Sequence, residues 1–93
     1  MTGSSDSNTV SSNTAAILDT VGLMCPEPIM LLHKLVREVT DGDEIRVIAT
    51  DPATKRDVPH FCQFLGHELL SSSHEENAEG EQFVYQIKVH KPL

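Results

Sequence analysis

The chain has 93 residues, of which 39% are hydrophobic, and this length accommodates one small domain and excludes a multidomain enzyme. Fourteen acidic and seven basic residues give a formal charge of -7, and only four side chains are aromatic. Broad nucleic-acid binding depends on Lys and Arg neutralising phosphates, so we expect no tight direct contact with nucleic acid. The basic residues do concentrate between positions 34 and 56, which makes that segment locally positive.

The sequence contains no run of about 18 apolar residues, so we expect no membrane-spanning helix. The first 30 residues contain no Lys or Arg, and the opening MTGSSDSNTVSSNT is not typical of a secretory signal. With two cysteines, Cys25 and Cys62, the chain is also unlike a small secreted domain held together by disulfides. We therefore expect a cytoplasmic protein with free thiols.

Elements can be predicted in chain order from composition and periodicity. Residues 1–14 are almost all small and polar, which predicts a flexible tail followed by one domain over 15–93. A β-branched segment predicts the first strand at 15–21. Apolar residues at three- and four-residue spacings then predict an amphipathic helix over 26–40, and a second strand follows at 44–50.

The second half of the chain predicts one further helix and two strands. The helix is expected from Ala53 to about Leu65, with Pro59 indicating a late start or a kink. A third strand is expected at 67–73, a turn over the polar run 73–81, and a fourth strand at 83–89. The order βαβαββ predicts an α/β two-layer sandwich in which two helices pack on a four-stranded mixed sheet.

The segment that points to chemistry is MCPEP at 24–28, where a loop meets the first helix. Proline is tolerated in a first helical turn, so Pro26 is expected near the first helical position and Cys25 at the cap. The positive helix end favours a thiolate or a persulfide anion there, by roughly one pKa unit at most. Glu27 and the net charge oppose this effect, and Pro26 and Pro28 remove two amides. We therefore predict a reactive, accessible thiol that is not permanently ionised.

Other interpretations of the two cysteines stay open. A lone cysteine is equally well explained as a small buried apolar residue. A dithiol cycle needs a resolving cysteine close by, and Cys62 lies 37 residues beyond Cys25, so Cys25 is expected to act alone or with a partner protein's cysteine. Cys62 falls on the apolar stripe of the second helix, which predicts a core position, with a redox role as the minority alternative.

Two stretches of the chain, GLMCPEPIM and IATDPATKRDVPHFCQFLGHEL, resemble the TusA family of bacterial sulfur carrier proteins, also called SirA-like. The resemblance spans about residues 17–90. Its most specific signals are the CPxP motif at 25–28, the DPA element at 51–53 and the Arg56-Asp57 pair. Members of this family adopt a two-layer βαβαββ sandwich resembling the C-terminal domain of a translation initiation factor.

The resemblance implies a sulfurtransferase-type carrier rather than a stand-alone turnover enzyme, with no cofactor. Cys25 would accept a sulfane sulfur from a cysteine desulfurase as a persulfide and relay it to a downstream sulfur-relay protein complex. The complete DPATKRD segment favours the branch whose relay ends in 2-thiouridine at the wobble position of tRNA. Other branches with the same motif serve molybdenum-cofactor metabolism or the oxidation of inorganic sulfur.

The resemblance also places Asp51 and Arg56 at the site, where they would shape it together with Pro26, Glu27 and Pro28 or dock partners. Asp51 is equally well explained as a turn residue, because it precedes a proline.

A basic face on the first helix, formed by His33, Lys34 and Arg37, is either a solvated surface or a docking surface for the desulfurase or the acceptor. The five histidines are dispersed and form no recognised zinc spacing with the cysteines, so no metal site is expected. Two other classes stay open: a regulatory or protein-binding module of the SirA type with a structural Cys25, and a thiol-disulfide reductase that pairs Cys25 with Cys62 or a recruited thiol.

Overall fold

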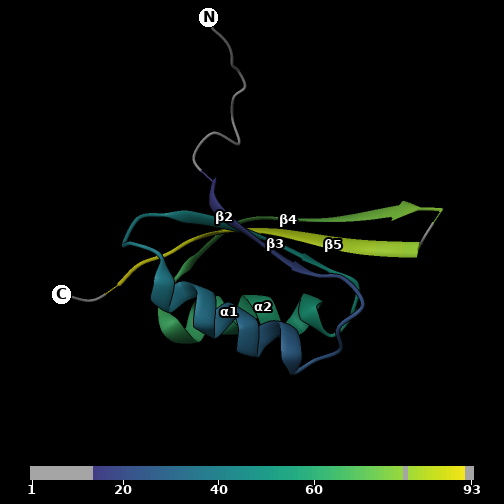
Figure 1. Ribbon diagram of the computed structural model, residues 1–93, viewed down its shortest axis with the longest axis horizontal. Coiled ribbons are helices and arrows are strands. Elements are labelled where there is room, and N and C mark those ends of the chain that lie inside the picture. Colours follow the sequence, from purple (N-terminus) through teal and green to yellow (C-terminus); the bar gives the residue numbers. More distant parts are fainter. Residues whose placement is uncertain (1–13, 79, 92–93) are drawn as a thin grey trace, which may run out of the picture.

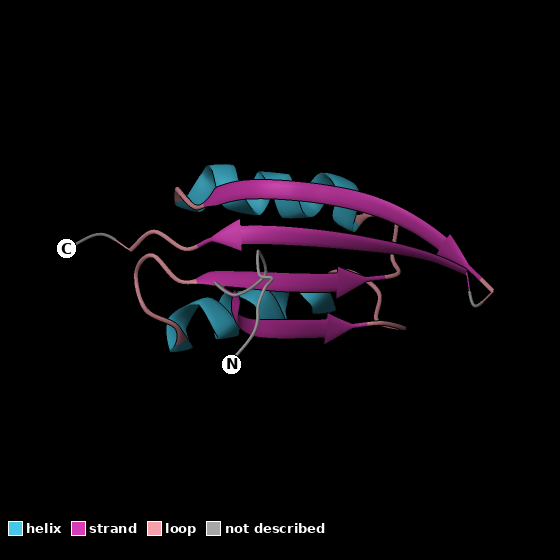
Figure 2. Cartoon of the chain, turned by 90° about the horizontal axis from the view of Figure 1, so that it is seen from above, coloured by secondary structure: helices cyan, strands magenta, loops and turns pink. Residues whose placement is uncertain are grey.

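The computed structural model describes residues 14–78 and 80–91 of the chain. Its elements are, in order, β2 (Thr14–Thr20), α1 (Glu27–Glu38), β3 (Glu44–Ala49), α2 (Thr54–Leu65), β4 (Glu68–Asn77) and β5 (Gly80–Lys88). Both helices lie on one face of the four-stranded sheet (Figures 1 and 2). The predicted two-layer βαβαββ sandwich is therefore confirmed. The tail predicted at 1–14 lies outside the described residues, except for Thr14, which begins β2.

The sheet is mixed, with the strand order β2-β3-β5-β4. Strands β2 and β3 run parallel, whereas β5 is antiparallel to both β3 and β4. A parallel pair needs a crossover connection, and α1 supplies it. The carboxyl ends of β2 and β3 consequently lie at the same end of the sheet, and both helices begin there. Neither helix is long and apolar enough to span a membrane within the described part of the chain.

The hydrophobic core lies between the sheet and the helices. Alternate residues of β3 and β5 point toward the helices, as the period of a strand requires. The helices contribute their apolar stripes, and Cys62 is only 2% exposed among them, which confirms its predicted core position. The buried apolar residues are Leu32, Ile45, Val47, Ala49, Val58, Phe61, Cys62, Phe83, Tyr85, Ile87 and Val89.

Two helix boundaries differ from the prediction. The helix α1 has Pro26 at its N-cap position and begins at Glu27, so Cys25 lies one residue before the cap. The helix α2 begins at Thr54 and continues through Pro59, so the late start is wrong. Pro59 lies in the second turn, where its missing N–H leaves the carbonyl of Lys55 without its helical donor. Burial of the apolar face of α2 against the sheet offsets that loss.

The turn predicted over 73–81 is wrong, because β4 continues to Asn77 and β5 begins at Gly80. The two strands stay paired from Glu68↔Lys88 to Asn77↔Gly80. Figure 1 shows that this hairpin extends past the ends of the helices. Both faces of its outer part meet solvent, so polar residues such as Ser73 and Glu75 remain exposed within a strand. Cross-strand pairing thus outweighs the polar composition that predicted a turn.

The different burial of two residues of α1 predicts that their substitution by alanine changes the stability of the protein to very different extents. Leu32 is fully buried, so Leu32→Ala should lower the free energy of unfolding by about 2–5 kcal/mol through lost burial and an unfilled cavity. Met30 is 62% exposed on the same helix, and Met30→Ala should change it by less than about 0.5 kcal/mol. Urea unfolding followed by circular dichroism measures both, and equal effects of the two variants would contradict this packing.

Candidate functional site

The candidate site lies where the loops after β2 and β3 meet. The amide of Gly22 donates to Thr50 Oγ1 at 2.9 Å, and the amide of Cys25 donates to Asp51 Oδ2 at 2.6 Å. Gly22 has a φ of 85°, a left-handed conformation that a glycine adopts without strain. The peptide bond between Cys25 and Pro26 is cis. The two loops are thus joined at the carboxyl ends of two parallel strands. Ligand-binding sites of open α/β sheets commonly lie at this end of the strands.

Asp51 organises both loops through its carboxylate. Its Oδ1 accepts the Ala53 amide at 3.0 Å, which closes the turn before α2, while its Oδ2 accepts the Cys25 amide. The hydrogen bonds from Cys25 and Ala53 lower the pKa of Asp51, because they stabilise the ionised carboxylate. Asp51 therefore has the turn contact expected of its position before a proline and, in addition, a direct contact to the cysteine loop.

The thiol of Cys25 is half-buried, and its electrostatic surroundings disfavour ionisation. Burial raises its pKa to about 11, assisted by a hydrogen bond to Asp57 and by the negative charges of Asp51 and Asp57. The stabilisation of a thiolate expected from the helix end is therefore outweighed. Cys25 lies before the cap, and the prolines at 26 and 28 have no amides to offer a sulfur anion. At neutral pH a thiol with this pKa is protonated, and the predicted reactivity of Cys25 stays a prediction.

The sequence analysis noted Asp57 only as part of the Arg56-Asp57 pair, and the structure adds it to the site. Its side chain is 28% exposed and approaches the thiol, whereas the neighbouring Arg56 side chain is 82% exposed. Arg56 Nε contacts Asp57 Oδ1 at 3.1 Å, so among its described contacts Arg56 reaches the thiol only through this carboxylate. Helical spacing could have indicated that Asp57 faces the Asp51 loop. Asp57 lies one turn after Ala53, whose carbonyl accepts the Asp57 amide.

A buried hydroxyl pair supports the loop that carries Asp51. Thr54 Oγ1 donates to the carbonyl of Asp51 at 2.7 Å and lies 2.9 Å from the Tyr85 hydroxyl. A hydroxyl has one proton, and a carbonyl only accepts, so Tyr85 is the donor to Thr54. Burial raises the pKa of Tyr85, which keeps this donor protonated. Neither residue was expected at the site, because nothing in the sequence relates a residue of α2 to one of β5.

The residues expected to shape or dock at the site occupy different surroundings. Pro26 and Glu27 are exposed, and Pro28 is a buried residue in the first turn of α1. Pro26 and His33 line a groove between α1 and α2, and His33 also lines an adjoining hollow together with Arg37. Lys34 is exposed but does not line this groove. The expected basic face of α1 is thus divided, because His33 and Arg37 line hollows of the surface whereas Lys34, one turn before Arg37, does not.

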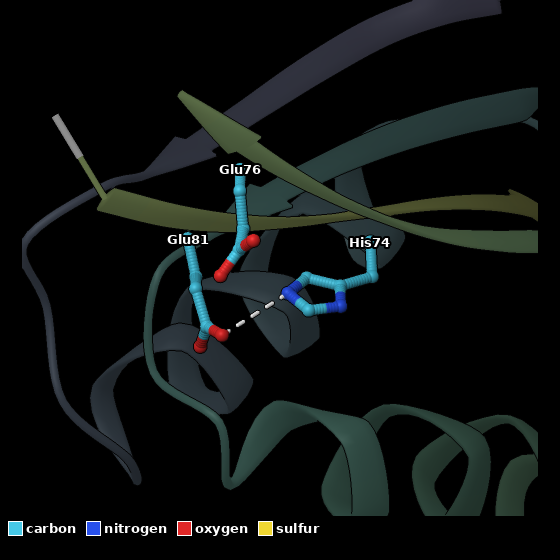
Figure 3. A group of neighbouring side chains, drawn as sticks. All are labelled: His74, Glu76 and Glu81. Carbon is cyan, nitrogen blue, oxygen red and sulfur yellow. Dashed lines mark ion pairs between the residues drawn. The ribbon is translucent and has the colours of Figure 1, made fainter. Parts of the chain in front are cut away.

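Potential metal ligands meet at one place within the described residues, at the outer end of the β4–β5 hairpin (Figure 3). Ligand atoms of His74, Glu76 and Glu81 all lie within 4.8 Å of one another. The sequence spacing did not reveal this group, because Glu81 comes from the strand opposite. All three residues are exposed, and His74 Nε2 lies 3.4 Å from Glu81 Oε2. A surface ion pair accounts for the approach of His74 to Glu81.

The surroundings of Cys25 predict how its alkylation depends on pH and on Asp57. Because the thiol has a pKa of about 11, its rate constant with iodoacetamide should keep rising up to about pH 10. Asp57→Asn removes a negative charge and lowers that pKa. Alkylation at neutral pH should then be about three- to fourfold faster for each unit of decrease, since the lower nucleophilicity partly offsets the larger thiolate fraction.

Peptide mapping by mass spectrometry separates Cys25 from the buried Cys62. The matched control is Glu75→Gln, which removes an exposed carboxylate from β4 and should leave the rate unchanged. A rate that levels off near pH 7, or an Asp57→Asn variant that reacts more slowly than wild type, would contradict the described electrostatics.

Comparison with known proteins identifies the family to which the chain is similar. The model of the family described as Sulfurtransferase TusA matches residues 16–89. A sulfur carrier protein TusA of Pseudomonas savastanoi pv. phaseolicola is 53% identical over 73 residues, covering 78% of this chain and 82% of the relative. Another, from Pseudomonas entomophila, is 62% identical over 60 residues, covering 64% and 75%.

A solved structure resembles the fold. The crystal structure of a SirA-like protein from Desulfitobacterium hafniense superposes with a TM-score of 0.62 and covers 82% of this chain and 99% of its own. Its sequence identity is 19%, so this likeness concerns the fold alone. The family match extends from β2 to the end of the sheet and includes both loops that meet at Cys25, and on that ground the chain belongs to the TusA family.

Proposed function

We propose that this protein is a sulfur carrier whose Cys25 holds the sulfur as a persulfide. The observation that carries the proposal is the position of Cys25: a half-buried thiol at the carboxyl ends of two parallel strands, tied to Asp51 and opening beside a groove. Membership of the TusA family, with relatives named sulfur carrier proteins, supports it. A carrier needs a thiol that partner proteins can reach, rather than a deep pocket for a small substrate.

Loading proceeds by thiol–persulfide exchange. The Cys25 thiol loses its proton, and the thiolate attacks the outer sulfur of a cysteine persulfide on the donor. One S–S bond forms at Cys25 while the S–S bond of the donor breaks. The donor cysteine leaves as a thiolate and takes up a proton, so the transfer consumes no external oxidant or reductant.

Unloading repeats the exchange in the opposite sense. A thiolate of the acceptor attacks the outer sulfur of the Cys25 persulfide, and Cys25 leaves as a thiolate. Its high pKa then favours prompt reprotonation, which returns the carrier to its resting thiol. Asp51 and Asp57 act as positioning residues in this cycle: Asp51 holds the loop, and Asp57 contacts the thiol.

The donor in this proposal is a cysteine desulfurase, and the acceptor is a protein of a sulfur-relay complex in the cytoplasm. We further propose that the relay ends in 2-thiouridine at the wobble position of tRNA. The complete DPATKRD segment supports that branch by its resemblance to the family. The acidic charge of -7 fits a protein that passes sulfur to other proteins without holding tRNA tightly itself.

Intact-protein mass spectrometry tests the carrier function. Incubation with a cysteine desulfurase and cysteine should add the mass of one sulfur atom to the wild-type chain, and a reductant should remove it. Cys25→Ser should show no gain, while Cys62→Ser, if it remains folded, should load like wild type. A gain that persists in Cys25→Ser would refute Cys25 as the carrier. No gain with several desulfurases would favour a protein-binding module instead.

Complementation tests the pathway. In a bacterial strain that lacks its own tRNA-thiolation carrier, the wild-type gene should restore 2-thiouridine in tRNA, and the Cys25→Ser gene should not. Mass spectrometry of digested tRNA measures the modified nucleoside. If the chain loads sulfur in vitro yet does not restore 2-thiouridine, the tRNA branch is contradicted. A role in molybdenum-cofactor metabolism or in the oxidation of inorganic sulfur is then favoured.

A further inference from the structure

The outer end of the β4–β5 hairpin carries three potential metal ligands, His74, Glu76 and Glu81, here called the hairpin cluster. His74 and Glu76 are two residues apart on β4, and Glu81 is paired with Glu76 across the hairpin. Because side chains alternate along a strand, all three project from the same face of the hairpin. Figure 3 shows the imidazole and the two carboxylates turned toward one another on that face.

Strand pairing and the core hold the hairpin cluster in place. The register shift between β4 and β5 lies between Leu69 and Ser71, before the cluster, so facing residues stay in step from there to the end of the hairpin. The ring of His74 is stacked on that of Phe83, with the ring centroids 5.0 Å apart and the planes at 17°. Phe83 is only 2% exposed, so the imidazole rests on a residue of the core.

The distances within the hairpin cluster suit a single ion. Ligand atoms of the three residues all lie within 4.8 Å of one another. His74 Nε2 is 3.4 Å from Glu81 Oε2, which is longer than a charge-assisted hydrogen bond of about 2.7–2.9 Å. Donor atoms that surround Zn²⁺ tetrahedrally at about 2.1 Å lie about 3.4 Å apart. Small rotations of the exposed glutamate side chains bring the remaining oxygens to the same spacing.

The charges of the hairpin cluster favour a cation. Glu76 and Glu81 face each other directly across the hairpin, and like charges in this arrangement destabilise a strand pair. The ion pair of His74 with Glu81 leaves Glu76 without a cationic partner among the described residues. The segment 74–82, HEENAEGEQ, contains four glutamates and neither Lys nor Arg. A bound cation would therefore neutralise carboxylates that the ion pairs of the chain leave opposed.

We propose that His74, Glu76 and Glu81 bind one divalent transition-metal cation, for which Zn²⁺ is the probe, and that this ion ties the two strands of the outer hairpin together. An imidazole and carboxylates are ordinary ligands of Zn²⁺. Ca²⁺ and Mg²⁺ prefer oxygen ligands alone, so the imidazole discriminates against them. The site differs from the zinc spacings considered in the sequence, because two of its three ligands are carboxylates and one comes from the opposite strand.

Isothermal titration calorimetry with Zn²⁺ tests the binding. Every variant carries Cys25→Ser in the untagged full chain, so that the accessible thiol does not compete for the ion. The parent should bind one Zn²⁺ per chain. His74→Gln and Glu81→Gln should each raise Kd at least about tenfold, because each removes a ligand. Ca²⁺ at the same concentration should produce no comparable binding.

Two matched controls separate coordination from net charge. Glu75→Gln removes an equal charge from the other face of β4, and His60→Gln removes an exposed imidazole from α2. Both should bind Zn²⁺ within about twofold of the parent. If Glu75→Gln weakens binding as much as Glu81→Gln, the ion is adventitious and is attracted by net charge only. Binding that His74→Gln leaves unchanged, or no binding of the parent, overturns the proposal as well.

Amide hydrogen exchange tests whether the ion ties the strands together. At a Zn²⁺ concentration of about 100 times Kd, exchange in residues 74–76 and 81–82 should slow at least about tenfold. Exchange in α1, which holds none of the ligands, should stay unchanged and serves as the internal control. Equal exchange of the outer hairpin with and without Zn²⁺ would show that the ion does not join its strands.

Discussion

The hydrogen bond between the Cys25 amide and the Asp51 carboxylate, at 2.6 Å, is the interaction on which the site depends. It joins two loops that are 26 residues apart in the chain. The parallel pairing of β2 with β3 makes the contact possible, because it brings both loops to the same end of the sheet. Tyr85 and Thr54 support the Asp51 loop from the core, so the position of the thiol is linked to the packing of β5.

Burial, together with the nearby carboxylates of Asp51 and Asp57, keeps Cys25 protonated. A thiol with a pKa of about 11 is largely unreactive at neutral pH, which protects an accessible cysteine from indiscriminate oxidation. The same property slows a nucleophilic attack by Cys25. A carrier that meets its donor and acceptor as proteins resolves this conflict when the partner supplies the compensating charge. The exposed Arg56, which pairs with Asp57, already moderates the negative charge in the free protein.

A groove between α1 and α2 lies beside the thiol, and its lining includes Pro26, His33 and Asp57. Each of the two helices follows a strand of the parallel pair, so both helices begin at the end of the sheet that carries the cysteine loop. The fold thus positions the thiol and the neighbouring groove with the same two helices.

The sequence by itself determined the order of elements and indicated Cys25 as the candidate carrier cysteine. Alternation in the strands and the apolar stripes of the helices depend on local periodicity, which is visible along the chain, and the CPxP motif marks Cys25 directly. The sequence alone did not determine the length of the β4–β5 hairpin, because its polar residues are stabilised by pairing with the opposite strand. It also did not show Asp57 or Tyr85 at the site, or the raised pKa of Cys25. These properties depend on side chains that only the sheet pairing and the helix packing bring together.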